Sequence, residues 1–248
     1  MNIVCVIPAR FGSTRFPGKP LALLGGKTII ERVYEQAGKA HTINAVFVAT
    51  DDSRIAGTVR AFGGNAIMTS PECASGTDRI AEAVRDLSAD IVVNVQGDEP
   101  LISPVTIDMT VQALQESPEC TVSTPAVELH DHEDFNSPHI VKVVFDPKGH
   151  ALYFSRSPIP SPVRRDDLTG TAPLYGYKHL GLYVYRREAL EGFSTMLPSR
   201  LETIEKLEQL RFLEHGYRIR VVVVEEDSAG IDTPEELQAL ERMMSGNR

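Results

Sequence analysis

The sequence contains little cysteine, and its three cysteines form no paired pattern. Cys5, Cys73 and Cys120 are odd in number and widely spaced, and no CxxC occurs. This spacing predicts reduced thiols and argues against a disulfide framework or a cysteine-based zinc site. The chain also lacks an apolar run of about eighteen residues, and its start, MNIVCVIPARFGS, has neither the basic region nor the cleavage site of a signal peptide. We therefore expect a soluble cytoplasmic protein.

Positive charge is scarce over the whole chain, whose formal net charge is -9. This balance argues against a nucleic-acid backbone or an anionic membrane as the main partner, so any anion site must be local. The stretch from Met1 to Ile30 reverses the balance, because it holds Arg10, Arg15, Lys19 and Lys27 and no carboxylate.

The first half of the chain alternates short apolar strands with amphipathic helices. Strands are predicted at 2–8, 45–50, 65–68 and 91–95, and helices at 28–40, 53–62 and 77–87. This βαβαβαβ series predicts a right-handed, mostly parallel sheet, which is an α/β fold. Ligands of such sheets bind beyond the carboxyl ends of the strands.

The second half is less regular and predicts a smaller subdomain with mixed strand pairing. Strands are expected at 120–127, 139–145, 151–154, 179–185 and 219–224, a single helix at 200–216, and a last helix with Thr233 as its cap and Pro234 as its first residue. The stretch 157–176 is rich in proline, glycine and charge, and predicts a mobile flap or a partner-contacting loop. We expect one domain over 1–248, with a core at about 1–118 and 217–248 and a subdomain at about 119–216.

The loop after the first strand has the composition of a phosphate site. It reads PARFGSTRFPGKP (8–20), with Arg10, Arg15 and Lys19 beside two glycines that allow close backbone approach. It is not a Walker A loop, because Gly12 and Gly18 are separated by five residues and Lys19 precedes a proline, and it contains no GxGxxG. The alternative is a solvated basic turn.

Two acids follow predicted strands at the ligand-bearing edge of the sheet. Asp98 lies near the end of the segment IVVNVQGDEP (91–100), and Asp232 precedes the last helix. Together they resemble a magnesium pair, since this ion prefers one or two carboxylates plus substrate phosphates. The alternatives are a turn cap for Asp98 and helix capping for Asp232, although Thr233 can fill the capping position itself.

Several long motifs follow one another along the chain. They are IPARFGSTRFPGKPL (7–21), VATDD (48–52), SGTDRIAE (75–82), VNVQGDEP (93–100), VKVVFD (141–146), ALYFSRSPIP (151–160), KHLGLYVYR (178–186), LEQLRFLEHG (207–216) and GIDTPEEL (230–237). In this order they resemble the 3-deoxy-manno-octulosonate (Kdo) cytidylyltransferases, or CMP-Kdo synthetases, of bacterial lipopolysaccharide assembly. The resemblance implies a doubly wound nucleotidyltransferase that binds CTP at the first loop and Kdo over the second half, with a homodimer formed through the mixed strands.

The resemblance also implies the site residues. The nucleotide would be bound by Arg10, Ser13, Arg15, Lys19, Ser75, Thr77, Arg79 and Gln96, and the sugar by Arg156, His179, Tyr183, Glu208 and Gln209. Mg²⁺ would be held by Asp98 and Asp232, which form the catalytic set together with Arg10 and Lys19. The implied reaction is an in-line attack of the anomeric hydroxyl of Kdo on the α-phosphorus of CTP, with pyrophosphate as the leaving group.

The residue types on the sugar side suit this chemistry. Arg156 can pair through two hydrogen bonds with the carboxylate of Kdo, although it could also be a surface cation. His179 can bind hydroxyls, although a lone strand histidine is more often structural, and the strand period places Tyr183 on the same side. The stripe of Leu201, Ile204, Leu207 and Leu210 is expected in the core, with Glu208 at its edge.

Two further features have plainer interpretations. The run His130-Asp131-His132-Glu133-Asp134 looks like a metal cluster but lies in a polar connection, so we expect solvated surface. Lys142 interrupts an apolar strand, where it can extend its ammonium to water from an edge strand.

Three other functions remain open at this point. The same reaction could use another acid sugar, such as a sialic acid or an amino-substituted Kdo. A glycosyltransferase of similar fold would use a sugar nucleotide instead, which the cationic loop argues against. A nucleotide sensor would bind without turnover, which Asp98 and Asp232 argue against.

Overall fold

The computed structural model describes residues 1–12, 15–161, 174–228 and 230–246. The chain divides into two units. Unit 1 comprises Met1–Asp108, Arg186–Ser194 and Ser228–Arg248, and unit 2 comprises Met109–Tyr185 and Thr195–Asp227. Unit 2 is longer at both ends than the predicted subdomain and omits Arg186–Ser194. No helix in the described ranges is long and apolar enough to cross a membrane.

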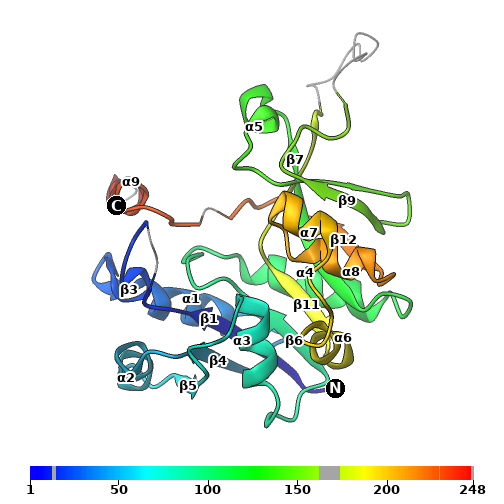
Figure 1. The fold of residues 1–248 in the computed structure, drawn as a ribbon. Coiled ribbons are helices and arrows are strands. Elements are labelled where there is room, and N and C mark those ends of the chain that lie inside the picture. The colour runs from blue at the N-terminus through cyan, green and yellow to red at the C-terminus, as the bar shows by residue number, and fades with distance from the viewer. Residues whose placement is uncertain (13–14, 162–173, 229, 247–248) are drawn as a thin grey trace. The chain divides into compact units, whose positions relative to one another are not determined.

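Unit 1 is built on four parallel strands in the order β5-β4-β1-β6 (Figure 1). They are β1 (Ile3–Ala9), β4 (Ala45–Thr50), β5 (Asn65–Met68) and β6 (Ile91–Asn94). Counted along the chain this order is 3-2-1-4, so the direction of winding reverses between β1 and β6. Such a switch point opens a crevice for ligands at the carboxyl ends of the strands. The predicted mostly parallel, doubly wound α/β fold is confirmed.

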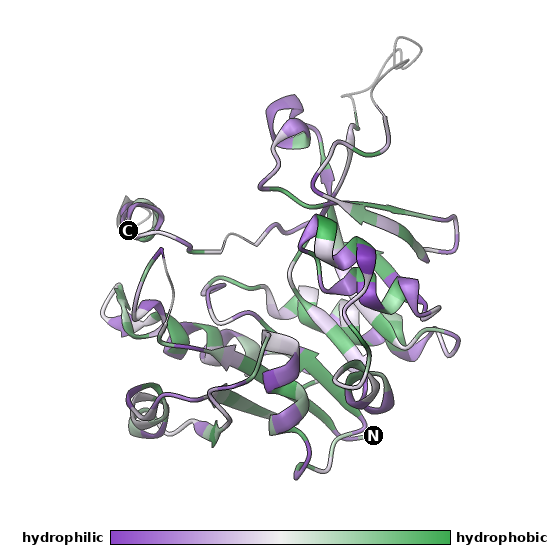
Figure 2. Ribbon diagram, viewed as in Figure 1, coloured by the Kyte–Doolittle hydropathy of each residue, from purple (hydrophilic) through white to green (hydrophobic). Residues whose placement is uncertain are grey.

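The strands of unit 1 are apolar because they are covered on both faces. Every residue of β6 is buried, and six of the seven residues of β1 are buried. Figure 2 shows hydrophobic residues concentrated in these strands and polar residues on the helices around them. The helices of unit 1 are α1 (Ile29–Ala37), α2 (Ser53–Ala61), α3 (Gly76–Ala83), α6 (Arg187–Phe193) and α9 (Pro234–Gly246), with a 3-10 turn η1 (Lys19–Leu21) and a hairpin of β2 (Leu23–Leu24) and β3 (Lys27–Thr28).

Three of these helices begin at side chains that accept hydrogen bonds from the first turn. Thr28, Asp52 and Ser75 cap α1, α2 and α3 respectively. A cap of this kind satisfies one of the amide groups that have no partner within the helix, and it contributes about 1 kcal/mol. Helix α4 (Pro104–Gln115) begins in unit 1 and ends in unit 2.

Unit 2 has the mixed strand pairing that the sequence predicted, and its sheet is centred on β7. Strand β7 pairs with β12 in parallel and with β10 and β11 in antiparallel, and β10 continues through β8 to β9. The strands are β7 (Val122–Leu129), β8 (Lys142–Phe145), β9 (Ala151–Ser155), β10 (Gly176–His179), β11 (Tyr183–Arg186) and β12 (Ile219–Val223), and the helices are α5 (His132–Asn136), α7 (Arg200–Glu205) and α8 (Gln209–Glu214).

Three predictions for unit 2 are wrong. The helix expected over 200–216 is two helices, because Lys206 takes the left-handed conformation (φ 57°) that ends α7. Ile204 of the expected core stripe is therefore 64% exposed, whereas Leu207 and Leu210 are buried. The strand expected over 179–185 is likewise two strands, β10 and β11, which both pair with β7.

Candidate active site

The two predicted metal ligands lie at one point in unit 1, where they share a cation. The Nζ atom of Lys19 lies 2.6 Å from Oδ2 of Asp98 and 3.2 Å from Oδ1 of Asp232. The guanidinium of Arg15 pairs with the other oxygen of Asp232 at 2.9 Å. Asp98 follows β6 and Lys19 follows β1, so the group stands at the switch point of the sheet. Two carboxylates that converge on one cation form a donor set that suits a hard divalent ion.

A tight turn in the first loop directs Lys19 toward these acids. Gly18 has φ 73°, a left-handed conformation that a side chain would strain, and its amide donates to the carbonyl of Phe11 at 2.9 Å. The ring of Phe11 lies 3.1 Å from the place where a Cβ of Gly18 would stand. Arg54 covers this ring, with its Cζ 3.4 Å from the centroid, which adds a cation–π contact.

The loops that carry Asp98 and Asp232 are joined through their backbones. The amide of Ile231 donates to the carbonyl of Asp98 at 2.9 Å, and the hydroxyl of Ser228 donates to the carboxylate of Glu99 at 2.8 Å. Gly97 precedes Asp98, and a Cβ there would lie 2.8 Å from the carbonyl oxygen of Pro8. The glycine therefore lets the loop after β6 pass close to the end of β1.

Asp232 is not needed as a helix cap, as the sequence suggested. The hydroxyl of Thr233 accepts from the amide of Glu236 at 3.2 Å, and the carboxylate of Glu236 accepts from the amide of Thr233 at 3.0 Å. This reciprocal capping box begins α9 at Pro234. The carboxylate of Asp232 is left to pair with Arg15 and Lys19.

Most of the other predicted nucleotide-binding residues are buried or form hydrogen bonds within unit 1. Arg10 is exposed, and Ser13 lies outside the described residues. Ser75 caps α3, and the buried Arg79 donates to the hydroxyl of Thr69 at 2.6 Å. The remaining two also lie in unit 1: Thr77 is buried in α3 and Gln96 donates to Asn94 at 3.2 Å. Their nucleotide contacts stay predictions.

Arg156, the predicted anchor for the sugar carboxylate, is held by carbonyl oxygens in unit 2. Its Nε donates to the carbonyl of Glu205 at 3.1 Å, and its Nη1 donates to the carbonyl of Pro138 at 3.2 Å. Within the described part of the chain, no carboxylate forms an ion pair with its guanidinium. The nearby carboxylate of Glu205 contacts the amide of Arg156 and forms no direct ion pair with the guanidinium, so the guanidinium can still pair with an anionic ligand.

His179 and Tyr183 are in ring contact, with centroids 5.3 Å apart, although they belong to different strands. Nε2 of His179 lies 2.8 Å from the hydroxyl of Thr124, and burial lowers the pKa of His179 to about 3. The histidine is therefore neutral at physiological pH. Burial also raises the pKa of Tyr183 well above its ordinary value, so this phenol keeps its proton.

Gln209 carries a buried donor that the described residues leave without a hydrogen-bond partner. The side chain is 4% exposed, and its Nε2 has no acceptor in the described part of the chain. Such a group costs about 1–3 kcal/mol unless a ligand or water accepts from it. Glu208, the other predicted sugar ligand, lies directly before α8 and is half-buried.

Sequence reasoning misjudged Lys142 and missed Glu205. Lys142 was expected on an edge strand, but β8 lies between β10 and β9 and the lysine is fully buried. The carboxylate of Glu205 accepts from the amide of Arg156 at 3.0 Å. No spacing in the sequence signals this contact, because 49 residues separate the two partners.

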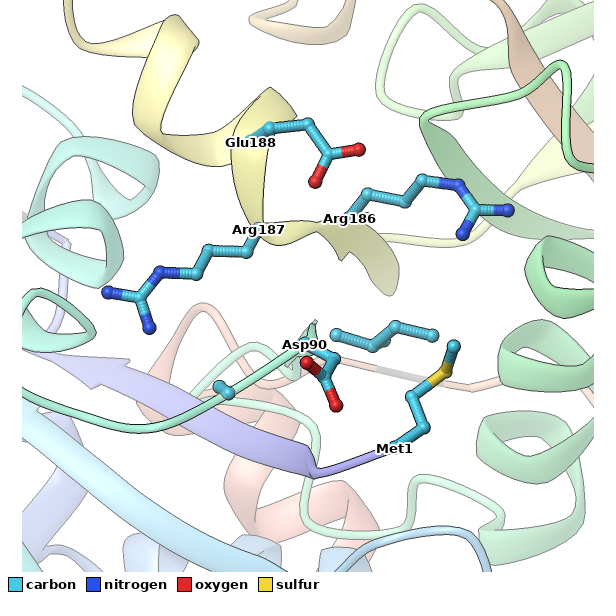
Figure 3. A pocket seen from close by; sticks show the side chains of 7 residues that line it. Met1, Asp90, Arg186, Arg187 and Glu188 are labelled. Carbon is cyan, nitrogen blue, oxygen red and sulfur yellow. The ribbon is translucent and has the colours of Figure 1, made fainter.

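Two other groups of polar residues lie outside this site. The acidic and histidine run at 130–134 forms the start of α5 behind the capping residue Asp131 and is exposed, as expected. A hollow of about 510 Å³ in unit 1 is lined by Met1, Asp90, Arg186, Arg187 and Glu188 (Figure 3). It adjoins the start of β6 and thus the amino ends of the strands, opposite to the edge where such sheets bind ligands.

Comparison with known proteins identifies the family of this chain. A family model described as "Cytidylyltransferase" matches residues 4–219. The chain is 51% identical to the 3-deoxy-manno-octulosonate cytidylyltransferases of Pelobacter propionicus and of Geobacter sulfurreducens. Each alignment covers 96% of this chain, and they cover 95% and 97% of the two relatives.

A solved structure is similar over the full length. It is a CMP:2-keto-3-deoxy-manno-octonic acid synthetase complexed with CTP, with a TM-score of 0.93, 41% identity and complete coverage of both chains. A cytidylyltransferase from Leptospira borgpetersenii has a TM-score of 0.66 at 18% identity, covers 99% of this chain and 87% of its own, and shares the fold.

Proposed function

This chain belongs to the cytidylyltransferase family, and on that premise we propose that it transfers CMP from CTP to Kdo, giving CMP-Kdo and pyrophosphate. The family resemblance drawn from the motifs is confirmed by the comparisons. The observation that carries the proposal is the convergence of Asp98 and Asp232 on Lys19 at the switch point of the sheet. This arrangement supports the proposal, because it brings two carboxylates and a cation together where such sheets bind ligands.

We propose Mg²⁺ as the cofactor, with Asp98 and Asp232 as its protein ligands. The donor set suits it, because both are carboxylates and the ammonium of Lys19 already lies between them. A bound Mg²⁺ would neutralise charge on the phosphates. Lys19 and Arg15 would then be free to pair with the triphosphate instead of with these acids.

The reaction needs no covalent intermediate. The anomeric oxygen of Kdo forms a bond to the α-phosphorus of CTP, the bond from this phosphorus to the bridging oxygen breaks, and the hydroxyl proton is released. Negative charge accumulates on the departing pyrophosphate. Arg10, Arg15 and Lys19 are the cations that stabilise it, so catalysis consists mainly of positioning and charge neutralisation.

On the sugar side we propose that Arg156 binds the carboxylate of Kdo. Its guanidinium is held only by carbonyl oxygens among the residues described, and so retains its charge for an anion. Gln209 supplies a buried Nε2 that a sugar hydroxyl can satisfy. His179 and Tyr183, with Glu208, complete the proposed set. Neutral His179 would exchange hydrogen bonds with hydroxyls rather than pair with the carboxylate.

Product analysis tests the proposed substrates. The protein is incubated with CTP, Mg²⁺ and either Kdo, an amino-substituted Kdo or a sialic acid, each component is omitted in turn, and products are identified by mass spectrometry. We expect CMP-Kdo only in the complete mixture with Kdo. A CMP adduct formed only with another sugar would identify that sugar as the substrate in place of Kdo. Consumption of a sugar nucleotide would favour a glycosyltransferase. Binding of CTP without any product would contradict the enzyme assignment.

We further propose that the protein is a cytoplasmic homodimer that associates through unit 2. The support is the resemblance to the family, which implies a homodimer formed through the mixed strands. Light scattering coupled to size-exclusion chromatography measures the mass directly. A mass near twice that of the 27.3 kDa chain is expected, and a mass of one chain at all concentrations would contradict the proposal.

A further inference from the structure

The side chain of Lys142 is buried where an apolar residue would be ordinary. Its relative exposure is 0%, and β8 is flanked by β10 and β9, so the ammonium has no route to water along a sheet edge. Lys142 lies opposite Lys178 on one side and Ser155 on the other. Removing an ammonium from water is costly, and a well-packed apolar side chain at such a position is often no less stable. The packing of the core therefore does not explain this residue.

The hydrogen bonds of Lys142 account for all three of its N–H groups. Its Nζ donates to the carbonyl oxygens of Ser137 at 2.8 Å, Ile140 at 2.7 Å and Arg156 at 2.6 Å. No carboxylate in the described ranges forms an ion pair with it. Burial lowers the pKa of Lys142 and the neighbouring Arg156 lowers it further, whereas Glu205 acts in the opposite direction.

These three carbonyls belong to Arg156 itself and to the turn 137–140, which also holds the guanidinium of Arg156. Ser137 and Ile140 enclose Pro138, whose carbonyl accepts from Nη1 of Arg156 at 3.2 Å. Lys142 thus fixes both the backbone of Arg156 and the turn on which its guanidinium rests. A displacement of either segment would move the guanidinium relative to the rest of unit 2.

Glu205 supports Arg156 from the other side. Its carboxylate accepts from the amide of Arg156 at 3.0 Å and from the hydroxyl of Ser155 at 2.6 Å, and its carbonyl accepts from Nε of Arg156 at 3.1 Å. Burial acts to raise the pKa of Glu205, but the hydrogen bonds from Ser155, Arg156 and Tyr153 lower it overall. The carboxylate is therefore ionised while it accepts these bonds.

We infer that Lys142 is a positioning residue that, together with Glu205, orients Arg156 toward the carboxylate of the acid sugar. This inference rests on the proposed function of Arg156 as the sugar anchor. It adds a reason for the buried charge: a rigid arginine loses less freedom when it binds, and a small misplacement of such a group weakens binding and turnover. Lys142 itself does not touch the substrate in this account.

A double-mutant cycle tests the inference. Lys142→Met, Arg156→Ala and the double variant are compared with the unchanged protein for kcat and for the KM of Kdo and of CTP. We expect Lys142→Met to raise the KM for Kdo by about tenfold and to leave the KM for CTP within about twofold. In the Arg156→Ala background the same substitution should change the KM for Kdo by less than about twofold, because its effect passes through Arg156.

The outcomes separate this inference from the function on which it rests. An Arg156→Ala variant with an unchanged KM for Kdo overturns the anchor role and the inference with it. A Lys142→Met effect that is equally large with and without Arg156, or equal for CTP and Kdo, overturns the inference alone. Lys142→Gln keeps two N–H donors and should give a smaller rise in the KM for Kdo. If Lys142→Met does not fold, Lys142→Gln replaces it in the double-mutant cycle.

Discussion

Single residues decide the electrostatics of this protein, and Lys19 is the clearest case. Its ammonium separates the carboxylates of Asp98 and Asp232, although the side chain is only 12% exposed. Without it, two like charges would face each other in a partly buried place, which is unfavourable unless another cation arrives. The residue therefore has a role in the metal-free protein that differs from its proposed role on the triphosphate.

We predict that Lys19→Met lowers stability in the absence of metal. The expected loss is about 1–2 kcal/mol at neutral pH, kept modest because both acids are partly exposed. Added Mg²⁺ should raise the melting temperature of this variant more than that of the unchanged protein. Thermal unfolding in EDTA and in Mg²⁺ measures both quantities. If Lys19→Met and the unchanged protein had equal melting temperatures in EDTA, Lys19 would not be the cation that separates the acids.

The buried His179 predicts a dependence of stability on pH. Its pKa is about 3 in the folded protein against an ordinary value of 6.5, so between these values the unfolded chain binds a proton that the folded chain does not. Stability is then full above the unfolded pKa and falls as the pH drops from about 6.5 toward 3, by at most about 1.4 kcal/mol per pH unit.

His179→Gln should remove this contribution while it keeps a hydrogen-bonding group near Thr124. Denaturant unfolding measures the free energy of unfolding of both proteins from pH 7 to pH 4.5. The contribution of the carboxylates is the same in both proteins and cancels in the difference. We expect a steeper loss for the unchanged protein. Parallel curves would show that the imidazole is protonated in the folded state.

At the scale of elements, the backbone conformation at Lys206 separates α7 from α8. The residue is exposed, has φ 57° and is the only non-glycine residue with positive φ among those the structure describes. A left-handed conformation costs a residue with a side chain about 1 kcal/mol, and glycine adopts it freely. The break also exposes Ile204 and leaves Glu205 at the end of α7 beside Arg156.

We predict that Lys206→Gly raises the free energy of unfolding by about 0.5–1 kcal/mol. Arg200→Gly is the matched control, because Arg200 is an exposed residue of the same helix without positive φ, and it should lower stability by up to about 1 kcal/mol. Chemical denaturation measures both. A loss of stability in Lys206→Gly would mean that α7 and α8 are continuous in solution.

Elements with purely local signals were the ones that the sequence predicted well. Strands β4 and β5 have the predicted bounds, 45–50 and 65–68, because apolar runs between turn residues identify buried strands. The prediction of a single helix over 200–216 was wrong because the leucines keep a helical period across Lys206, and nothing local marks the left-handed residue. The pairing of Asp98 with Asp232 was predicted because each acid follows a strand, although β12, the strand before Asp232, belongs to the mixed sheet of unit 2.

For the molecule as a whole, contacts between distant segments were what the sequence did not predict. Lys142 looked like an edge residue because its neighbours in the sheet, β9 and β10, could not be assigned from spacing alone. Glu205 could not be matched to Arg156 for the same reason. The net charge of -9, in contrast, made the cations of the first loop conspicuous in the sequence, and Lys19 of that loop lies between the two acids.

In the function proposed above, this chain uses Asp98 at a magnesium site to transfer CMP from CTP to Kdo. The most direct test of this function is the rate of pyrophosphate release with all three components, compared among the unchanged protein, Asp98→Asn and the control Asp90→Asn at the opposite edge of unit 1. We predict release that needs every component, a fall of about a hundredfold or more in Asp98→Asn, and an unchanged rate in Asp90→Asn. Equal rates in all three proteins, or no release from the unchanged protein, would contradict the account.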